Sequence, residues 1–259
     1  MQRFLIIQTA FIGDVILCTP IISELKRCYP DAKIDVVLRK GNEQLLENHP
    51  AVNQLFTWDK KAGKYRSLIN VVRSFRSYKY DEVINLQRYY SAAIMCLFSR
   101  SNDKVGFNKN KLNFIYSRLV EHTIGDGTHE VERNLKTISH HNGAAQKTRP
   151  SIYPSDADKQ TVQSILKDGK PYFCMAPASV WETKKLPFSK WVELIANKCK
   201  YGYVYLLGGP QDKELCEKLK NKVPAKNIVN TCGHLTLLQS ASLMQHAKMN
   251  YVNDSEQLH

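Results

Sequence analysis

The sequence predicts an α/β protein with two Rossmann-like halves, each a parallel sheet with helices on both faces. Short β-rich apolar runs alternate with segments of helical periodicity from residue 4 to residue 252, and such alternation is typical of βαβ units. Pro, Gly and small polar residues interrupt this alternation at residues 142–158, which indicates a linker. A chain of 259 residues is long enough for two small domains. We therefore expect domains at residues 1–150 and 151–259.

The first half alternates regularly. Its expected strands are residues 4–8, 34–38, 54–58, 82–86 and 104–107, and its expected helices are residues 15–28, 42–48, 65–76, 91–98 and 129–138. In the helix at 65–76, Leu68, Val71, Val72 and Phe75 form the apolar stripe that should face the sheet. The polar residues 108–128 receive no assignment.

The second half resumes the alternation. Its expected helices are residues 157–166, 189–198, 213–222 and 237–245, and its expected strands are residues 172–175, 203–207, 227–229 and 249–252. Four strands are few for a doubly wound sheet, and Asp254-Ser255 has the form of a helix N-cap. We therefore expect the C-terminal domain to be truncated, with a further helix and strands missing.

Composition narrows the class of protein. No apolar run approaches the roughly 20 residues of a membrane span, and the N-terminus lacks a secretory cleavage pattern. The seven cysteines are scattered, with no Cys-x-x-Cys pair. We expect reduced thiols in a cytoplasmic protein, and neither a disulfide framework nor a zinc site.

The net charge of +13 is uneven. Residues 1–150 hold 23 Lys and Arg against 14 Asp and Glu, and residues 60–79 hold seven bases and no acid. An anionic partner would meet this half first: nucleic acid, an anionic membrane surface, or a phosphorylated or carboxylated substrate. A solvated basic face is the alternative. No helix-turn-helix, zinc-finger or RNA-recognition signature is present, so we expect no nucleic-acid partner.

The stretch from residue 4 to residue 20 organises the first half. A buried strand leads into a turn with Gly13, and Asp14 follows at the expected helix start. Ligands bind at the carboxyl ends of parallel strands, where such turns lie. Asp14 is either a helix N-cap or a general base at the mouth of a cleft.

The second half has four candidate anion- or nucleotide-binding turns. Ser179 follows a strand and Lys184 lies five residues on; Gly208-Gly209 and Gly233 each follow a strand; Asp254-Ser255 follows the last one. Small residues allow close approach of a phosphate, and helix-start amides and a lysine would offset its charge. For Lys184 the alternative is an ordinary solvated lysine.

Together these motifs resemble the bacterial lipopolysaccharide heptosyltransferases, glycosyltransferase family 9. The resemblance covers the whole chain and is carried, in order, by residues 9–14, Gly106-Phe107, residues 129–134, residues 184–187, residues 208–210, residues 233–237 and residues 253–259. Each motif is short, but their order and spacing are specific.

The resemblance implies a GT-B fold, with two Rossmann-like domains facing a cleft. The N-terminal domain would bind a lipid-linked anionic acceptor, and the C-terminal domain a nucleotide sugar, usually ADP-L-glycero-D-manno-heptose. It implies an inverting glycosyltransferase of lipopolysaccharide core biosynthesis that uses no metal and no cofactor. The expected location is cytoplasmic, or peripheral on the cytoplasmic face of the inner membrane.

The resemblance also implies roles for single residues. Asp14 matches the general base, Lys184 the lysine that stabilises the departing diphosphate, Asp254 the acid near the donor sugar, and His259 the end of the phosphate-side motif. Donor-binding candidates are Ser179, Lys184, Gly208, Gly209, Gly233, Asp254, Ser255 and His259. Acceptor-binding candidates are Gly13, Arg66, Arg73, Arg76 and Arg88.

Two positions differ from the family pattern. Leu186 stands where the family usually has Trp, and Glu256 stands where a small residue follows Asp-Ser. Glu256 and the expected truncation favour an alternative, a non-catalytic glycan-binding remnant, whereas Asp14 disfavours it. A second alternative is a family member that uses another nucleotide sugar.

Overall fold

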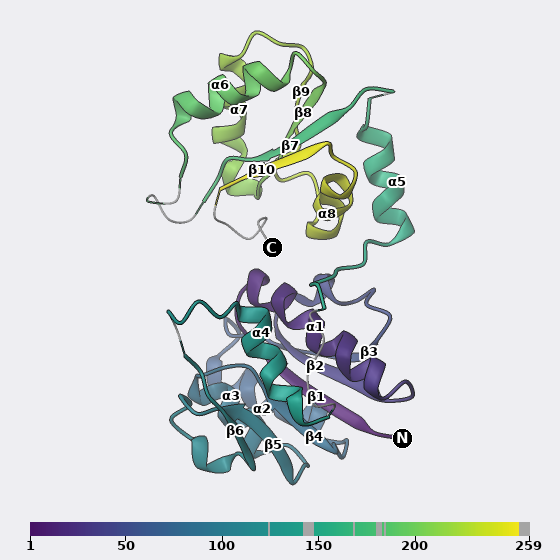
Figure 1. Ribbon diagram of the computed structural model, residues 1–259, viewed down its shortest axis with the longest axis vertical. Helices are drawn as coiled ribbons and strands as arrows, with labels where there is room; N and C mark the ends of the chain where they lie inside the picture. Colours follow the sequence, from purple (N-terminus) through teal and green to yellow (C-terminus); the bar gives the residue numbers. More distant parts are fainter. Residues whose placement is uncertain (124, 142–147, 168, 180–182, 184, 254–259) are drawn as a thin grey trace. The chain divides into compact units, whose positions relative to one another are not determined.

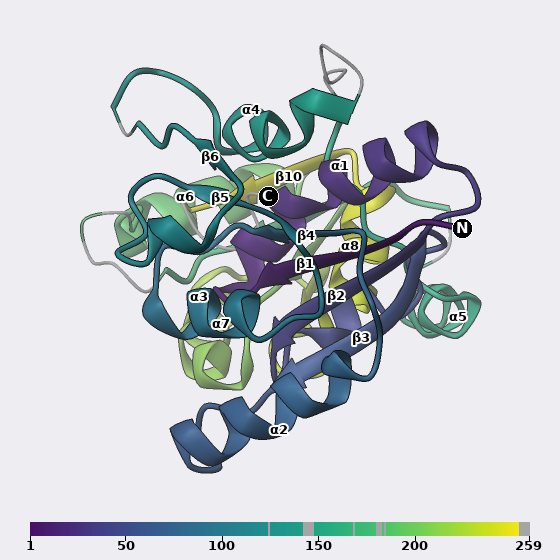
Figure 2. The same ribbon diagram turned by 90° about the horizontal axis from the view of Figure 1, so that it is seen from below.

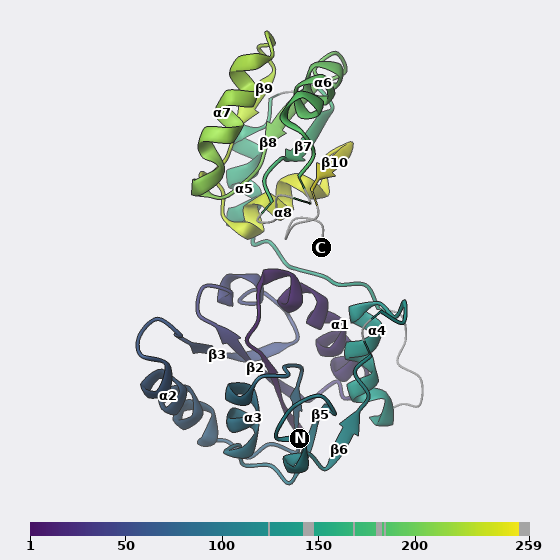
Figure 3. The same ribbon diagram turned by 90° about the vertical axis from the view of Figure 1, so that its left-hand side faces the viewer.

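A computed structural model describes residues 1–259 except 124, 142–147, 168, 180–182, 184 and 254–259. The chain forms two compact units, Met1–Ile152 and Tyr153–His259. Residues 148–155, which have no helix or strand, connect them (Figure 3). Each unit is an α/β structure with an all-parallel sheet, as the alternating pattern predicts.

The first unit contains a six-stranded sheet of order β3-β2-β1-β4-β5-β6 (Figure 1). Its strands are β1 Arg3–Gln8, β2 Lys33–Arg39, β3 Val52–Trp58, β4 Glu82–Asn85, β5 Asp103–Phe107 and β6 Arg118–Val120. Its helices are α1 Ile12–Cys28, α2 Lys64–Arg76, α3 Tyr90–Leu97 and α4 Glu130–Leu135, with 3₁₀ turns η1 Glu43–Leu45, η2 Asn113–Ile115 and η3 Lys136–His141.

Helices cover both faces of this sheet (Figure 2). The stripe Leu68, Val71, Val72 and Phe75 of α2 packs with α3 against Leu5 and Ile7 of β1. Side chains alternate along a strand, so Phe4 and Ile6 face the side that α1 and α4 cover, and both are fully buried. The central strands are apolar on both sides because both of their faces are covered.

The second unit contains a four-stranded sheet of order β10-β7-β8-β9. Its strands are β7 Tyr172–Ala176, β8 Tyr203–Leu206, β9 Ile228–Asn230 and β10 Met249–Val252. Its helices are α5 Asp156–Ile165, α6 Phe188–Lys198, α7 Lys213–Lys222 and α8 Leu237–Gln245, with the 3₁₀ turn η5 Pro210–Asp212. Trp191 of α6 and Leu219 of α7 belong to the core on one face of the sheet, and Val162 of α5 and Leu243 of α8 to the core on the other.

Two sequence predictions are wrong in detail, and one strand lies in a segment that received no assignment. α1 begins at Ile12 rather than at residue 15. Residues 42–48 hold only a 3₁₀ turn, Glu43–Leu45, instead of a helix. The unassigned residues 108–128 include β6, whose three residues are too few to show periodicity. Among the described residues, no helix combines the length and the apolar character that crossing a membrane requires.

Candidate active site

Each sheet has one point at which its strand order reverses. In the first unit the chain proceeds outward from β1 to β3 in one direction and from β4 to β6 in the other. In the second unit β10 returns to pair with β7 on the side opposite β8. Crevices form outside the carboxyl ends of the strands at such switch points, and ligands bind there. The topology therefore predicts that ligands bind at the loops after β1 and β4, and at the loops after β7 and β10.

A buried pair of glutamines bridges the switch point of the first unit. The Gln87 amide Nε2 donates to Oε1 of Gln8, and both side chains are buried. The backbone N–H of Gln87 donates to Oδ1 of Asn85 at 2.9 Å, and Nδ2 of Asn110 donates to the Gln87 carbonyl at 3.1 Å. These bonds fix the loop after β4 next to the loop after β1. The sequence analysis missed both glutamines.

Asp14 lies in the first turn of α1 beside this pair. The backbone N–H of Phe11, which is the N-cap residue, donates to Oδ2 of Asp14 at 3.3 Å. The N-cap interpretation of Asp14 is therefore wrong in position, because the helix starts three residues earlier than expected. Asp14 closes a capping box from inside the helix. It is half-buried at the carboxyl edge of the sheet, as is Gly13.

Cys18 lies one turn after Asp14 and is completely buried. Burial, together with the charge of the Asp14 carboxylate, raises the pKa of the Cys18 thiol to about 12. Cys18 therefore stays a neutral thiol at physiological pH, which rules it out as a nucleophile. Asp14 is the ionisable side chain in this turn that can accept a proton.

Two of the acceptor-binding candidates lie near this edge. Arg88 follows β4 directly and is exposed, and Arg66 lies in the first turn of α2, which follows the carboxyl end of β3. Arg66 belongs to a hollow of about 470 Å³ lined by Thr57, Asp59, Ala62, Arg66, Ser67 and Asn70. The lining thus combines one cation, one carboxylate, and hydroxyl and amide groups.

The other two arginine candidates are exposed to solvent but lie away from the carboxyl edge of the sheet. Arg73 and Arg76 follow Arg66 by seven and ten residues on α2, which places them about 10 and 15 Å farther along the helix axis. The helix runs from the carboxyl edge of the sheet towards the amino edge. The structure therefore brings Arg66 and Arg88 to the candidate edge and leaves Arg73 and Arg76 away from it.

Several aromatic side chains in the segments that follow β1, β4 and β5 are exposed. Phe11 is 65% exposed, Phe114 is 79% exposed, and Tyr89 and Tyr90 are also exposed. The Lys111 ammonium lies 5.6 Å from the Tyr90 ring centre, an arrangement that favours cation–π attraction. These aromatic residues follow strands in the sequence, but none of them was predicted as a site residue.

The switch point of the second unit is organised by Asn253, which directly follows β10. Its Nδ2 donates to the Pro177 carbonyl at 2.6 Å, and its Oδ1 accepts from the backbone N–H of Leu186 at 3.1 Å. The side chain is 6% exposed. Asn253 thus clamps both ends of the loop that follows β7 and carries Ser179, which is half-buried.

The two glycine turns of the second unit contact each other. The Gly233 N–H donates to the Gly208 carbonyl at 3.0 Å, so the turns after β8 and β9 share a backbone bond. Gly233 has φ +73°, and a Cβ on it would lie 3.0 Å from Cα of Pro210. The Gly209 N–H donates to Oδ2 of Asp212 at 2.8 Å. The three glycines allow a close-packed backbone edge that a side chain would obstruct.

Four of the predicted site residues cannot be placed. Lys184, Asp254, Ser255 and His259 lie outside the described residues. Their roles as catalytic and donor-binding residues stay predictions.

Comparison with known proteins gives a consistent result. A family model described as Glycosyltransferase family 9 (heptosyltransferase) matches residues 68–259. Lipopolysaccharide heptosyltransferase 3 of Escherichia coli K12 is 28% identical over 255 residues, which cover 91% of this chain and 72% of that protein. Asp14 precedes the span of the family model.

Solved structures share the fold. A glycosyl transferase family 9 protein from Veillonella parvula superposes with a TM-score of 0.89 at 18% identity and covers 100% of this chain and 76% of that one. Escherichia coli heptosyltransferase WaaC with ADP gives a TM-score of 0.81 at 22% identity, covering 100% and 83%. The predicted α/β architecture of the GT-B type is confirmed. With the family model matching most of its length, the chain belongs to glycosyltransferase family 9 and is a glycosyltransferase.

Proposed function

We propose that this glycosyltransferase moves a heptose or a related sugar from an ADP-sugar to an anionic lipopolysaccharide core acceptor, with inversion and without a catalytic metal. The main support for this proposal is the position of Asp14, a half-buried carboxylate at the switch point of the first sheet. The similar proteins support the substrate class, because one is a lipopolysaccharide heptosyltransferase and another is a heptosyltransferase with ADP.

In the proposed reaction, Asp14 accepts the proton of an acceptor hydroxyl. The freed oxygen pair forms a bond to the anomeric carbon, and the bond from that carbon to the diphosphate oxygen breaks, so that ADP leaves with the electron pair. Attack opposite the leaving group inverts the anomeric centre. One base suffices for this step, and cations and backbone amides near the diphosphate would stabilise its growing charge. We assign that second task to Lys184 and the segment after Asn253.

The acceptor is proposed to bind at the carboxyl edge of the first sheet. Arg66 and Arg88 would pair with its phosphates or carboxylates, and Tyr89 and Tyr90 would stack on sugar rings. The exposed Phe11 and Phe114 would approach a membrane surface, which supports a peripheral location on the inner membrane's cytoplasmic face. Sedimentation with anionic vesicles, compared with neutral vesicles, tests that location.

The donor proposal is tested by calorimetric titration of the chain with ADP and, in parallel, UDP. We expect selective binding of ADP, because the proposed donor is an ADP-sugar. Selective binding of UDP would mean that the donor is a UDP-sugar, and the chain would still be a transferase. A mass-spectrometric transfer assay with ADP-heptose and a heptose-deficient core lipopolysaccharide then tests the reaction. Binding of ADP without transfer to this acceptor would contradict the proposed acceptor class.

A further inference from the structure

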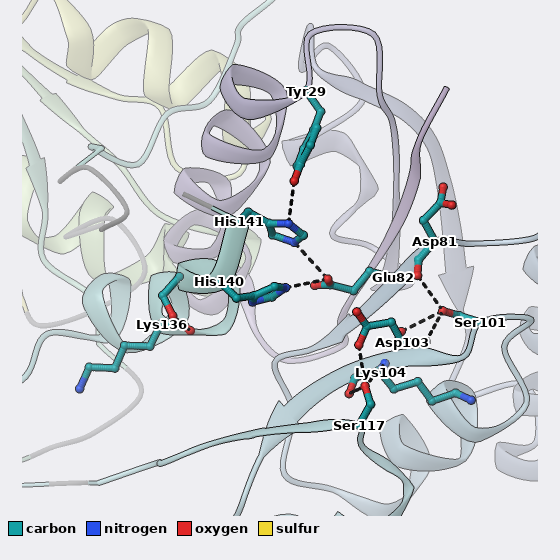
Figure 4. A network of polar contacts seen from close by, with 11 residues as sticks. Tyr29, Asp81, Glu82, Ser101, Asp103, Lys104, Ser117, Lys136, His140 and His141 are labelled. Carbon is teal, nitrogen blue, oxygen red and sulfur yellow. Dashed lines mark hydrogen bonds and ion pairs between the residues drawn. The ribbon is translucent and has the colours of Figure 1, made fainter. Parts of the chain in front are cut away.

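A cluster of two histidines and one glutamate lies at the amino edge of the six-stranded sheet (Figure 4). Glu82 is the first residue of β4 and pairs with Phe4, near the start of β1. His140 and His141 end η3. Asp14 and the proposed acceptor site lie at the opposite, carboxyl edge. The cluster therefore belongs to neither switch point, and the inference drawn from it is independent of the proposed function.

The three side chains converge on one carboxylate. Nε2 of His140 lies 2.8 Å and Nε2 of His141 3.0 Å from Oε2 of Glu82. The side chains of Glu82, His140 and His141 are 4%, 21% and 11% exposed. One ligand atom from each residue lies within 4.8 Å of the other two. The cluster is thus pre-formed and mostly enclosed, with access from solvent on the His140 side.

The charge of Glu82 has no full compensation within the described part of the chain. Its ion-pair partners there are the imidazoles of His140 and His141. Its second oxygen, Oε1, is buried and has no hydrogen-bond partner among the described residues. A buried carboxylate in this state is costly unless a cation or further donors satisfy it.

A second layer of contacts suits a ligated imidazole. The Tyr29 hydroxyl lies 3.0 Å from Nδ1 of His141, so it can accept the Nδ1 proton when Nε2 binds a metal. The ring of Phe4 lies 5.5 Å from that of His141, in an edge-on orientation. A polar partner on the far nitrogen and an apolar wall are the usual surroundings of a histidine ligand.

We propose that Glu82, His140 and His141 form a binding site for a divalent transition-metal ion, with Zn²⁺ as the best match. Two imidazole nitrogens and a carboxylate oxygen are ligands that zinc accepts, and Oε1 of Glu82 or a water completes the coordination. The ion neutralises the buried carboxylate. It ties the end of η3 to the start of β4.

The role of this ion is structural. It lies at the edge of the sheet that does not carry Asp14, so the site is compatible with sugar transfer that needs no metal. Binding links two segments 58 residues apart in sequence, and a metal bound only by the folded state raises its stability in proportion to affinity.

The test is titration of the EDTA-treated, desalted whole chain with ZnCl₂ by calorimetry and with CoCl₂ by absorption spectroscopy, under reducing conditions. We expect one ion per chain and cobalt bands typical of nitrogen and oxygen ligands. His140→Ala and His141→Ala should each weaken zinc binding at least tenfold, and Tyr29→Phe should weaken it about tenfold through the lost partner of Nδ1. His246→Ala, which removes an exposed histidine of the second unit, should change nothing.

Three results would overturn the proposal: no zinc or cobalt binding, unchanged affinity in both histidine variants, or intense cobalt–thiolate absorption, which would assign binding to cysteines. If a histidine variant does not fold, X-ray absorption of the zinc-loaded wild-type chain decides the matter. Two imidazoles in the zinc shell support the site, and a shell without imidazole excludes it.

Discussion

At the residue scale, Asp14 closes a capping box, and this structural role is compatible with the proposed role as general base, which sequence reasoning treats as its alternative. Its Oδ2 accepts from the N-cap N–H of Phe11, and the same half-buried carboxylate lies where a base is needed. In a capping box the carboxylate accepts a hydrogen bond from a backbone N–H, and it keeps its ability to accept a proton. The local structural role therefore does not argue against the catalytic one.

Replacing Asp14 by Asn separates the two tasks. The amide oxygen can still accept from Phe11, so the melting temperature should change by less than 2 °C or so. The amide cannot take a proton, so turnover should fall by about 10²–10⁴-fold, while ADP affinity stays the same. Steady-state kinetics and calorimetry measure both quantities. Asp31→Asn, at an exposed position, is the control, and retained turnover in Asp14→Asn would remove Asp14 from the role of base.

Asn253 is the corresponding residue of the second unit. Asn253→Ala leaves the Pro177 carbonyl and the Leu186 N–H without their side-chain partner, which should cost about 2–4 kcal/mol in the free energy of unfolding. ADP affinity should fall as well, because the loop after β7 loses its clamp. Urea denaturation and calorimetry test this prediction.

The matched control is Asn250→Ala on the same strand. Asn250 is exposed, and its Nδ2 donates to the Met244 carbonyl at 3.1 Å, so its loss should cost within about 0.5 kcal/mol. Equal effects of the two substitutions would show that Asn253 has no special structural role.

At the element scale, two glycines in connecting segments of the second unit allow a matched pair of substitutions. Gly233 (φ +73°) and Gly169 (φ +68°) share a left-handed backbone, but only at Gly233 would a Cβ meet another atom, Cα of Pro210 at 3.0 Å. Gly169→Ala should cost about 1–2 kcal/mol for the backbone alone. Gly233→Ala should cost a further 1–3 kcal/mol or so for the contact. Urea unfolding of both variants measures the difference, and equal costs would mean that Pro210 moves aside freely.

The sequence predicts elements better than it predicts their ends and contacts. Strands such as β1 and β7 have apolar runs that only a sheet buried on both faces explains, and their prediction is confirmed. The predicted start of α1 is wrong because Gly13 and Asp14 are typical of a loop between a strand and a helix. In the structure both residues belong to the first turn of α1. β6 is three residues among polar neighbours and gives no period to detect.

The candidate site was predictable where it depends on single turns and not where it depends on strand neighbours. Gly13, Asp14 and Gly233 follow strands in the sequence, so their position at the carboxyl edge could be inferred. The bond between Gln8 and Gln87 requires that β4 lie beside β1, which the sequence does not state. Likewise, the separation of Arg66 from Arg76 depends on the direction of α2 across the sheet.

At the scale of the whole molecule, a buried histidine couples pH to the stability of the first unit. Burial lowers the pKa of His49 from 6.5 to about 4, so the folded state favours the neutral ring. This contribution is fully present above pH 6.5 and is lost as the pH falls from 6.5 towards 4. Between pH 7 and pH 5 the first unit should lose about 2 kcal/mol. Unfolding followed at both pH values with EDTA present measures the loss.

The variant His49→Asn is the control for this dependence. It should be less stable than the wild type at pH 7, since a buried ring is lost, but its stability should change less between pH 7 and pH 5. Burial, with the nearby Arg133 and Arg88 charges, also lowers the pKa of His122, so some dependence will persist. An unchanged slope in His49→Asn would exclude His49 as its source.

The central position of β1 has a consequence for synthesis on the ribosome. This strand is made before the other strands of its sheet, yet it lies between β2 and β4, and β4 begins only at Glu82. At a synthesis rate of roughly 5–20 residues per second, β4 is made about 4–15 s after β1. During that time β1 lacks its second neighbour in the sheet. We therefore expect a nascent-chain chaperone to bind β1 during this time. Stalled ribosomes carrying 60 residues should therefore crosslink to such a chaperone through residues 3–8, and those carrying 160 residues should not.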